Sequence, residues 1–168
     1  HHIAFAHRHF YCSAAAQAKA IGQLKAIIEH EVPDVCCFVE IDQGSAHSAH
    51  FNQLEQVVNA HYHCFDIDNK YGAESKLRSF SLTRGKSNAF IARRKIAFER
   101  LHFTHGTKRL IYKLLLADGL TLYFAHFSLK RNVRDLQLMQ VRQLIKDTPG
   151  EVLFLGDFNI LDGFGELT

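Results

Sequence analysis

Apolar residues recur at three- and four-residue steps in three segments of the chain, a spacing typical of helices with one buried face. The first predicted helix begins after Ser13, whose hydroxyl can cap it, and ends before Pro33, which cannot continue a helix. The third begins at Asn132 in a capping-box pattern and is broken by Pro149 and Gly150. The apolar positions that define the three helices are Ala20, Leu24, Ile27 and Ile28, then Phe51, Leu54, Val57 and Val58, then Val133, Leu136, Val141, Leu144 and Ile145.

Shorter apolar runs between these helices predict strands. Residues 34–41 are almost continuously apolar, as in a strand that is covered on both faces. Asp118 and Gly119 separate the runs at residues 110–116 and 120–127, which predicts a β-hairpin. The other predicted strands are residues 64–67, 79–82, 89–92, 101–103 and 151–156. Because helices interleave with a mixed, largely antiparallel set of strands, the predicted fold class is a layered α/β sandwich.

The length and composition are those of one compact domain. The chain has 168 residues, of which 47% are hydrophobic, and a chain of this size buries roughly 70% of its unfolded surface. The longest uncharged apolar runs, at residues 35–39, 120–127 and 152–155, are far shorter than the about 20 residues of a transmembrane helix. Residues 1–10 contain no cleavable apolar segment, so we expect no secretory signal, no membrane span and a cytoplasmic location.

The net charge and the cysteine content exclude few functions. A formal net charge of +3 suits a phosphate-bearing partner without requiring one. Cys36 and Cys37 are neighbours in one apolar run, where adjacent side chains point to opposite faces of a strand. Together with Cys12 and Cys64 they form no disulfide framework, and we expect buried free thiols in a reducing compartment.

Polar residues follow three of the predicted apolar strands at the point where each strand ends. They are Glu40 after residues 35–39, His126 after residues 122–125, and Asp157 and Asn159 after residues 152–156. If these strands lie side by side, their ends bring two carboxylates, an amide and an imidazole to one rim. Oxygen ligands of this kind suit Mg²⁺ or Mn²⁺, which keep several waters and share phosphate oxygens with a substrate. The pattern predicts metal-assisted hydrolysis of a phosphate ester, and Gly156 would let the backbone approach a ligand closely.

Four segments resemble motifs of the endonuclease/exonuclease/phosphatase (DNase I-like) superfamily, in the order in which that superfamily carries them. Residues 33–40, PDVCCFVE, resemble its pDvv.lQE strand, and residues 156–159, GDFN, resemble its GDFN motif. Residues 87–93, SNAFIAR, resemble its GNAilsR strand, and residues 124–129, FAHFSL, resemble its v.tHl segment. The resemblance covers most of the chain. It implies a four-layer sandwich of two mixed, largely antiparallel sheets flanked by helices, as a single domain over residues 1–168.

This resemblance also implies an enzyme, since the superfamily includes DNase I-like nucleases, abasic-site endonucleases, inositol polyphosphate phosphatases and sphingomyelinases. Carried over by it, Glu40 would ligate Mg²⁺ or Mn²⁺, and Asp157 would orient and help deprotonate the attacking water. Asn159 would hold this water or a phosphate oxygen, His126 would donate to a non-bridging phosphate oxygen, and Asn88 would add a further donor. The substrate would be a phosphate ester in a nucleic acid, a phosphorylated lipid or a small molecule.

Two parts of the superfamily's pattern have no counterpart in the chain. The metal-site Asn of its first strand is not matched in residues 1–10, and no Ser-Asp-His motif occurs before Thr168. We therefore expect a fragment of a longer domain that lacks its first strand, its C-terminal strands and part of its catalytic apparatus. The sheet edges and core surface that these segments should cover would then be exposed.

Each candidate residue also has a purely structural interpretation. An Asp after an apolar strand is often a turn residue, and Glu40 at a strand end can simply be solvated. His126 can be a core histidine with satisfied hydrogen bonds, and Asn88 can serve a turn or a backbone hydrogen bond. The basic residues either face phosphate groups or are solvated charges at sheet edges; they are Arg93, Arg94, Lys108 and Arg109.

Two other functions stay open on the sequence alone. The first is a non-catalytic module that uses the same scaffold to bind a phosphorylated lipid, a nucleic acid or a protein. The second is a zinc-binding role for some of the 12 histidines. His61, His63 and Cys64 have zinc-ligand side chains, although no second pair follows them at the spacing of a zinc finger.

Overall fold

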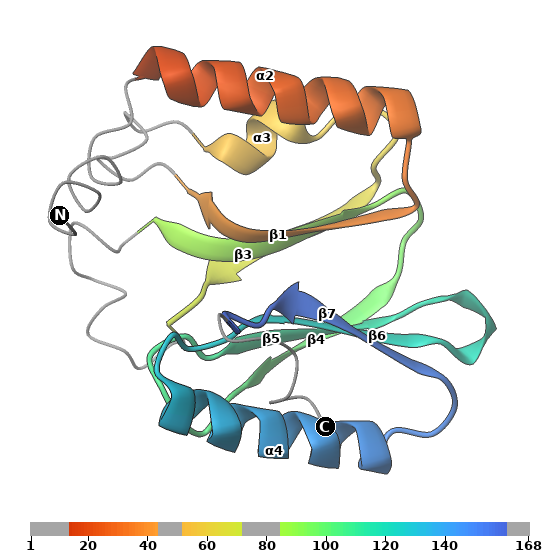
Figure 1. Ribbon diagram of the computed structural model, residues 1–168. Helices are drawn as coiled ribbons and strands as arrows, with labels where there is room; N and C mark the ends of the chain where they lie inside the picture. The colour runs from red at the N-terminus through yellow and green to blue at the C-terminus, as the bar shows by residue number, and fades with distance from the viewer. Residues whose placement is uncertain (1–13, 44–51, 72–84, 161–168) are drawn as a thin grey trace, which may run out of the picture.

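The computed structural model describes residues 14–43, 52–71 and 85–160. In these residues two β-sheets face each other, and helices cover the outer face of each sheet (Figure 1). Helices α2 and α3 lie over the first sheet, and α4 lies over the second. This arrangement confirms the four-layer α/β sandwich that the sequence predicts.

Strand β3 is the middle strand of the first sheet, with β1 and β2 antiparallel to it on either side. Neighbouring side chains of β3 point to opposite faces. Ala89 and Ile91 pack toward the helices, while Phe90 and Ala92 pack toward the second sheet. This part of the chain contains α2 (Ala14–Glu31), β1 (Val35–Asp42), α3 (Gln53–Val57), β2 (Cys64–Asn69) and β3 (Lys86–Ala92).

The second sheet has the order β4-β5-β6-β7. Its first three strands are antiparallel neighbours, whereas β7 runs parallel to β6 because α4 carries the chain back between them. Tyr112 and Phe124 point into the core between the sheets, and Ile111 and Tyr123 point toward α4. The elements are β4 (Ala97–His102), β5 (Leu110–Leu115), β6 (Thr121–His126), α4 (Arg131–Asp147) and β7 (Val152–Asp157).

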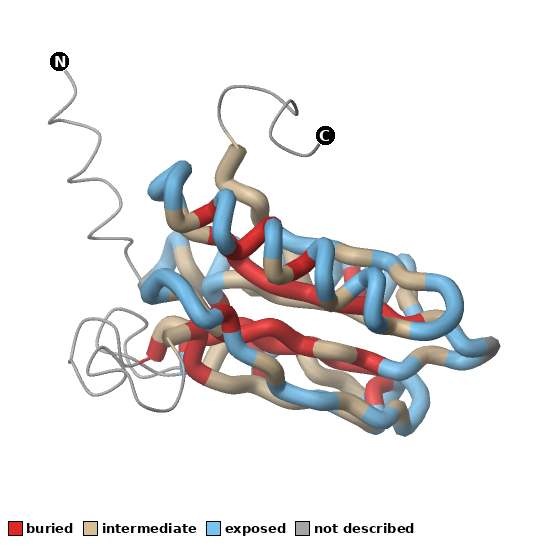
Figure 2. Tube along the Cα trace, turned by 90° about the horizontal axis from the view of Figure 1, so that it is seen from below, coloured by how far each residue is buried: buried red, intermediate tan, exposed pale blue. Residues whose placement is uncertain are grey.

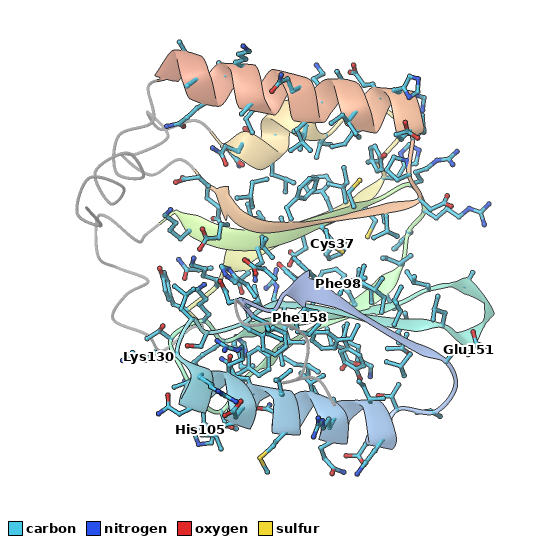
Figure 3. All side chains as sticks on the ribbon, viewed as in Figure 1. Cys37, Phe98, His105, Lys130, Glu151 and Phe158 are labelled. Atoms are coloured by element: carbon cyan, nitrogen blue, oxygen red, sulfur yellow. The ribbon has the colours of Figure 1, made fainter. Side chains whose placement is uncertain are left out.

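Buried residues follow the strands, and the outward turns of the helices are exposed (Figure 2). The space between the sheets is filled by side chains, among them those of Cys37 and Phe98 (Figure 3). Three cores therefore alternate with the four layers: α2 and α3 on the first sheet, sheet on sheet, and the second sheet on α4. None of the helices in the described ranges is long and apolar enough to cross a lipid bilayer.

The predicted strands within the described residues are present, with shifted bounds. Strand β4 starts at Ala97 rather than at residue 101, since its outer positions are exposed and polar and give no apolar run. Strands β5 and β6 pair as the hairpin expected around Asp118 and Gly119. Their connection is longer than a two-residue turn, because a 3₁₀ helix spans Ala117–Gly119. The predicted strand at residues 79–82, the cap Ser13, Phe51 and Cys12 lie outside the described residues.

Two expectations for α4 are wrong. The helix begins at Arg131 with Lys130 at its N-cap, so Asn132 lies inside the first turn and does not cap it. Leu136 and Ile145 are exposed at 41% and 39%, although their spacing predicts a buried face. Arg134, Gln137, Leu138 and Val141 are the residues that α4 buries. Arg134 is buried with its charge because its guanidinium donates to the carbonyl oxygens of residues 128 and 129, both at 3.1 Å.

Candidate active site

Strands from both sheets bring two carboxylates to the ring of His126. Glu40 lies near the end of β1, and its Oε1 is 3.6 Å from Nδ1 of His126, the last residue of β6. Asp157 is the last residue of β7 and the register partner of His126, and its Oδ2 is 3.4 Å from Nε2 of His126. Figure 1 shows why these ends meet: β1 and β7 belong to facing sheets and their arrows point the same way. The rim predicted from three strand ends is therefore formed.

Glu40 sits at an irregularity of β1. The register with β3 shifts between Phe38 and Ile41, and Glu40 has a φ of 59°. A non-glycine residue in this left-handed region costs roughly 1–3 kcal/mol of backbone strain, and such strain clusters at functional sites. The Glu40 N–H donates to Oδ1 of Asn88, at 3.4 Å, from the neighbouring strand β3. Asn88 is almost completely buried, and its side-chain oxygen holds the backbone of Glu40. This contact agrees with the structural interpretation of Asn88.

Two lysines contact this carboxylate–imidazole cluster. The ammonium group of Lys70, in the turn after β2, donates to Oε1 of Glu40, and its side chain is only 4% exposed. The ammonium group of Lys108, in the connection between β4 and β5, donates to Nε2 of His126. Sequence reasoning placed Lys108 in a basic set and missed Lys70. Lys70 follows a polar segment, and nothing in the local sequence indicates that it is buried where the two sheets pack together.

The lysines and the burial of the site shift the pKa values of both central groups. Burial alone raises the pKa of Glu40, but the hydrogen bond and charge of Lys70, with smaller effects of His126 and Lys86, lower it to about 2. Burial lowers the pKa of His126, and the charges of Lys108 and Lys70 lower it further, to about 4. At neutral pH the site therefore holds an ionised Glu40 and an uncharged imidazole.

The hydrogen-bond donors fix the tautomer of this imidazole. An ammonium group has donors only, so Nε2 of His126 must accept from Lys108 and the ring proton must be on Nδ1. Nδ1 is buried and makes no hydrogen bond to any residue in the described ranges. Its nearest acidic neighbour is Glu40, at 3.6 Å.

Asn159 acts on Asp157 through the backbone. Its N–H donates to Oδ1 of Asp157 at 3.0 Å, and its side-chain Nδ2 donates to the carbonyl oxygen of Phe127 at 2.8 Å. One oxygen of Asp157 is thus fixed by the turn while Oδ2 faces His126. Asn159 has a φ of 51°, a region that asparagine tolerates better than most residues.

Gly156 is required by the packing of the protein itself. A Cβ at this position would lie 2.0 Å from the carbonyl oxygen of Ala125 on β6. The absence of a side chain at Gly156 therefore permits the close approach of β7 to β6. It brings the ends of the two parallel strands, with His126 and Asp157, to the same level.

The donor set suits a metal ion that keeps most of its water. The carboxylates of Glu40 and Asp157 are 46% and 45% exposed, and each lies beside a different nitrogen of the His126 ring. Mg²⁺ is commonly bound through one or two carboxylates together with waters and substrate phosphates. In residues 14–43, 52–71 and 85–160 no group of three or more His, Cys, Asp or Glu side chains is placed to enclose a metal ion. The residues thus fit an open, water-rich site and not a closed protein cage.

The fold is shared with several solved structures. A TDP2 structure from Caenorhabditis elegans matches 90% of this chain and 44% of its own, at 18% identity and a TM-score of 0.60. D. rerio TDP2 complexed with a single-strand DNA product matches 86% of this chain and 55% of its own, at 22% identity and a TM-score of 0.59. The human Nocturnin catalytic domain with a bound sulfate anion matches 89% and 59%, at 15% identity and a TM-score of 0.56. The chain spans about half the length of these structures, and identities this low show the fold alone.

The sequence itself carries the family assignment. No curated protein matches the chain significantly. A model of the endonuclease/exonuclease/phosphatase family, in contrast, matches residues 8–167, nearly the whole chain. The match includes the four motifs at β1, β3, β6 and β7 that supply Glu40, Asn88, His126 and Asp157. The chain therefore belongs to the endonuclease/exonuclease/phosphatase family.

Proposed function

We propose that the protein is a divalent-metal-dependent hydrolase of phosphate esters. The observation that carries this proposal is the cluster in which His126 lies within 3.6 Å of Glu40 and 3.4 Å of Asp157. The half-exposed carboxylate of Glu40 is the side chain that could hold Mg²⁺ or Mn²⁺. The bound ion would polarise the phosphoryl oxygen and stabilise the leaving oxygen.

Asp157 is proposed to orient the attacking water. Its Oδ1 is occupied by the N–H of Asn159, so Oδ2 is the atom available to accept a hydrogen bond from water and to take its proton. Asn159 would act mainly by holding this carboxylate. Its Nδ2 uses one of its two N–H bonds on the carbonyl oxygen of Phe127, which leaves the second N–H and Oδ1 for a water or a phosphate oxygen.

The substrate class follows from the chemistry and from the neighbours in fold. D. rerio TDP2 was crystallised with a single-strand DNA product, which favours a nucleic-acid phosphodiester as the first substrate to test. The Nocturnin catalytic domain binds sulfate, an anion of phosphate-like shape and charge. Phosphorylated lipids and small phosphomonoesters are the alternative substrates, and the test includes a phosphomonoester.

Hydrolysis assays with a panel of substrates test the proposal. Bis(p-nitrophenyl) phosphate, p-nitrophenyl phosphate and a labelled single-stranded oligonucleotide would each be incubated with Mg²⁺, Mn²⁺ or EDTA. We expect turnover of at least one substrate with either metal, its loss in EDTA, and its loss in the Asp157→Asn variant. Phosphate binding without turnover of any substrate would instead support the non-catalytic module.

A further inference from the structure

We infer that Arg134 of α4 is a positioning residue that fixes residues 127–129, the segment after His126, and through this segment the turn of Asp157 and Asn159. The segment is bonded to the end of β7 on one side and to the buried face of α4 on the other. The part of the inference that concerns hydrolysis rests on the proposed function, whereas the part that concerns the position of the turn does not.

Phe127 joins the end of β6 to the turn at the end of β7. Its N–H donates to the carbonyl oxygen of Asp157 at 2.9 Å, and its own carbonyl oxygen accepts from Nδ2 of Asn159 at 2.8 Å. Its ring stacks on that of Phe158, with the centroids 4.9 Å apart. Because both backbone groups of Phe127 bond to this turn, a shift of Phe127 would move the carboxylate of Asp157 with it.

Arg134 holds the same segment from the side of the helix. Its Nη1 donates to the carbonyl oxygens of Ser128 and Leu129, both at 3.1 Å. These two residues lie in the connection between β6 and α4, where a carbonyl group needs a partner from outside the strand and helix ladders. Arg134 thus fixes two successive peptide groups of this connection.

The other polar groups of Ser128 are bonded as well. Its N–H donates to Oε1 of Gln137, a fully buried residue of α4, at 2.9 Å. Its hydroxyl group accepts from the N–H of Lys130 at 3.1 Å. Together with the bond from Arg134, these contacts leave the segment little freedom between the end of β6 and the start of α4.

Arg134 is buried at a cost in free energy that an apolar residue would avoid. It is 4% exposed, and a charged group loses favourable hydration when it leaves water. Leu138 and Val141, which α4 buries further along the helix, are apolar. The two buried polar residues, Arg134 and Gln137, come first, on the turns nearest to the connection that they hold. The place of the charge therefore follows the carbonyl groups that it bonds and not the packing of the helix.

The position of this turn matters for the proposed reaction because the carboxylate of Asp157 must meet the attacking water. A misplacement of about 1 Å that originates far from the reacting atoms can lower a rate about 10²-fold. Arg134 is buried, so it contacts no substrate itself. Its loss should therefore lower kcat more than it raises KM, since the orientation of the water suffers and the binding of the substrate does not.

Hydrogen exchange of backbone N–H groups tests the position of the turn without requiring turnover. In the wild type, the N–H of Phe127 should exchange within about tenfold of the rate of Tyr123 in β6, although Phe127 lies outside the strand. Arg134→Met removes the donor at similar side-chain length, and it should speed exchange at Phe127 and Asn159 about tenfold or more while Tyr123 changes less than about threefold. Unprotected Phe127 in the wild type, or unchanged exchange in a folded Arg134→Met protein, would overturn the inference.

Gln140→Met is the matched control, because Gln140 lies on the same helix and also bonds the backbone of a connection. Its Nε2 donates to the carbonyl oxygen of His102 at 3.0 Å, and its Oε1 accepts from the N–H of Thr104 at 2.9 Å. These bonds hold the connection after β4 and not the one after β6. The variant should therefore lose stability while kcat and the exchange rate of Phe127 stay within about threefold of wild type.

Kinetics separate this inference from the proposed function. If the wild type hydrolyses a phosphate ester, Arg134→Met should lower kcat about tenfold to a hundredfold, and Arg134→Lys, which keeps a charged donor, should recover part of the rate and of the slow exchange. Arg134→Lys carries the comparison with the wild type if Arg134→Met does not melt cooperatively. Wild-type kcat in a folded Arg134→Met protein would reject the role in hydrolysis and leave the hydrolase intact. Exchange that depends on Arg134, without turnover of any ester, would reject the hydrolase and leave the fixed turn.

Discussion

Asp157 and His126 are register partners at the ends of the parallel strands β7 and β6, with Oδ2 of the carboxylate 3.4 Å from Nε2 of the imidazole. Parallel neighbours end at the same edge of a sheet, so the pairing of two strands is enough to bring these side chains together. Glu40 reaches the same ring from the other sheet. The site therefore depends on how the two sheets face each other and not on one loop.

Asp157→Ala should abolish hydrolysis while the protein stays folded. A positioned general base contributes roughly 10²–10⁴-fold to the rate, so we expect kcat to fall by at least about a hundredfold. The side chain is 45% exposed and accepts one backbone hydrogen bond, which limits the loss of stability to about 1 kcal/mol. Asp157→Asn is the control for stability, because its amide oxygen keeps an acceptor for the Asn159 N–H. Steady-state rates and urea unfolding measure both effects, and activity within tenfold of wild type would contradict the role.

Tyr112→Phe should destabilise the contact between the sheets. The hydroxyl of Tyr112, on β5, donates to Oδ2 of Asp66 on β2 at 2.7 Å, and Arg100 donates to the same oxygen at 2.8 Å. Removing a buried hydrogen bond to a charged acceptor costs about 1–3 kcal/mol. Urea unfolding at pH 7 would show this as a lower midpoint. An unchanged midpoint would mean that the hydroxyl contributes nothing to the pairing of the sheets.

The raised pKa of Tyr112 makes the free energy of unfolding depend on pH in the alkaline range. Burial, together with the hydrogen bond to Asp66, raises the pKa of Tyr112 far above its usual value. In the unfolded chain the phenol ionises near pH 10, while in the folded protein it keeps its proton. Its contribution to the free energy of unfolding is therefore complete below about pH 10 and is lost as the pH rises further. Between pH 9 and pH 11, the wild type should lose more stability than Tyr112→Phe, and equal losses would contradict the shift.

Cys37 should be protected from alkylation. It packs in the core between the sheets, and its burial, with a smaller effect of Cys36, raises its pKa to about 12. The thiolate is the reactive form, so iodoacetamide should modify Cys37 far more slowly in the native protein than in urea. The rate in the native protein should still rise between pH 9 and pH 11, where an ordinary thiol has reached its plateau. Peptide mass spectrometry measures it site by site, and a plateau near pH 9 would contradict the raised pKa.

Much of the fold was predictable because burial on both faces leaves a clear local pattern. Strands β1, β5 and β6 are apolar almost throughout, and each supplies side chains to two cores. Strand β4 lies at the edge of its sheet with exposed polar positions, so only its end was recognised. The buried stripe of α4 was misplaced because it contains Gln137 and Arg134, whose burial depends on backbone acceptors outside the helix.

The candidate site was predictable only as far as its residues end apolar strands. Glu40, His126 and Asp157 carry this local signal, and the structure brings them together. Lys70 and Lys108 follow polar residues, and they reach the cluster because the turn after β2 bonds to the segment before β5. The backbone link from Arg109 to Lys70 is a contact between distant segments that no local pattern encodes. A charged residue in such a segment looks the same in the sequence whether it is solvated or part of a site.

Gly156→Ala should damage both the stability and the site, since the added methyl group would meet backbone. Its Cβ would lie 2.0 Å from the carbonyl oxygen of Ala125, so β7 must move away from β6. We expect a loss of about 1–3 kcal/mol, as in other overpacked positions, and a longer separation of His126 from Asp157 with reduced turnover.

Gly22→Ala is the matched control for this prediction. It makes the same substitution in the exposed middle of α2, where a Cβ meets nothing within 4 Å. An added methyl group there should stabilise the helix by about 0.5–1 kcal/mol, because alanine restricts the unfolded chain more than glycine does. The two alanines should therefore shift the urea midpoint in opposite directions. A Gly156→Ala protein as stable and as active as wild type would mean that β6 and β7 are not held as closely as their register requires.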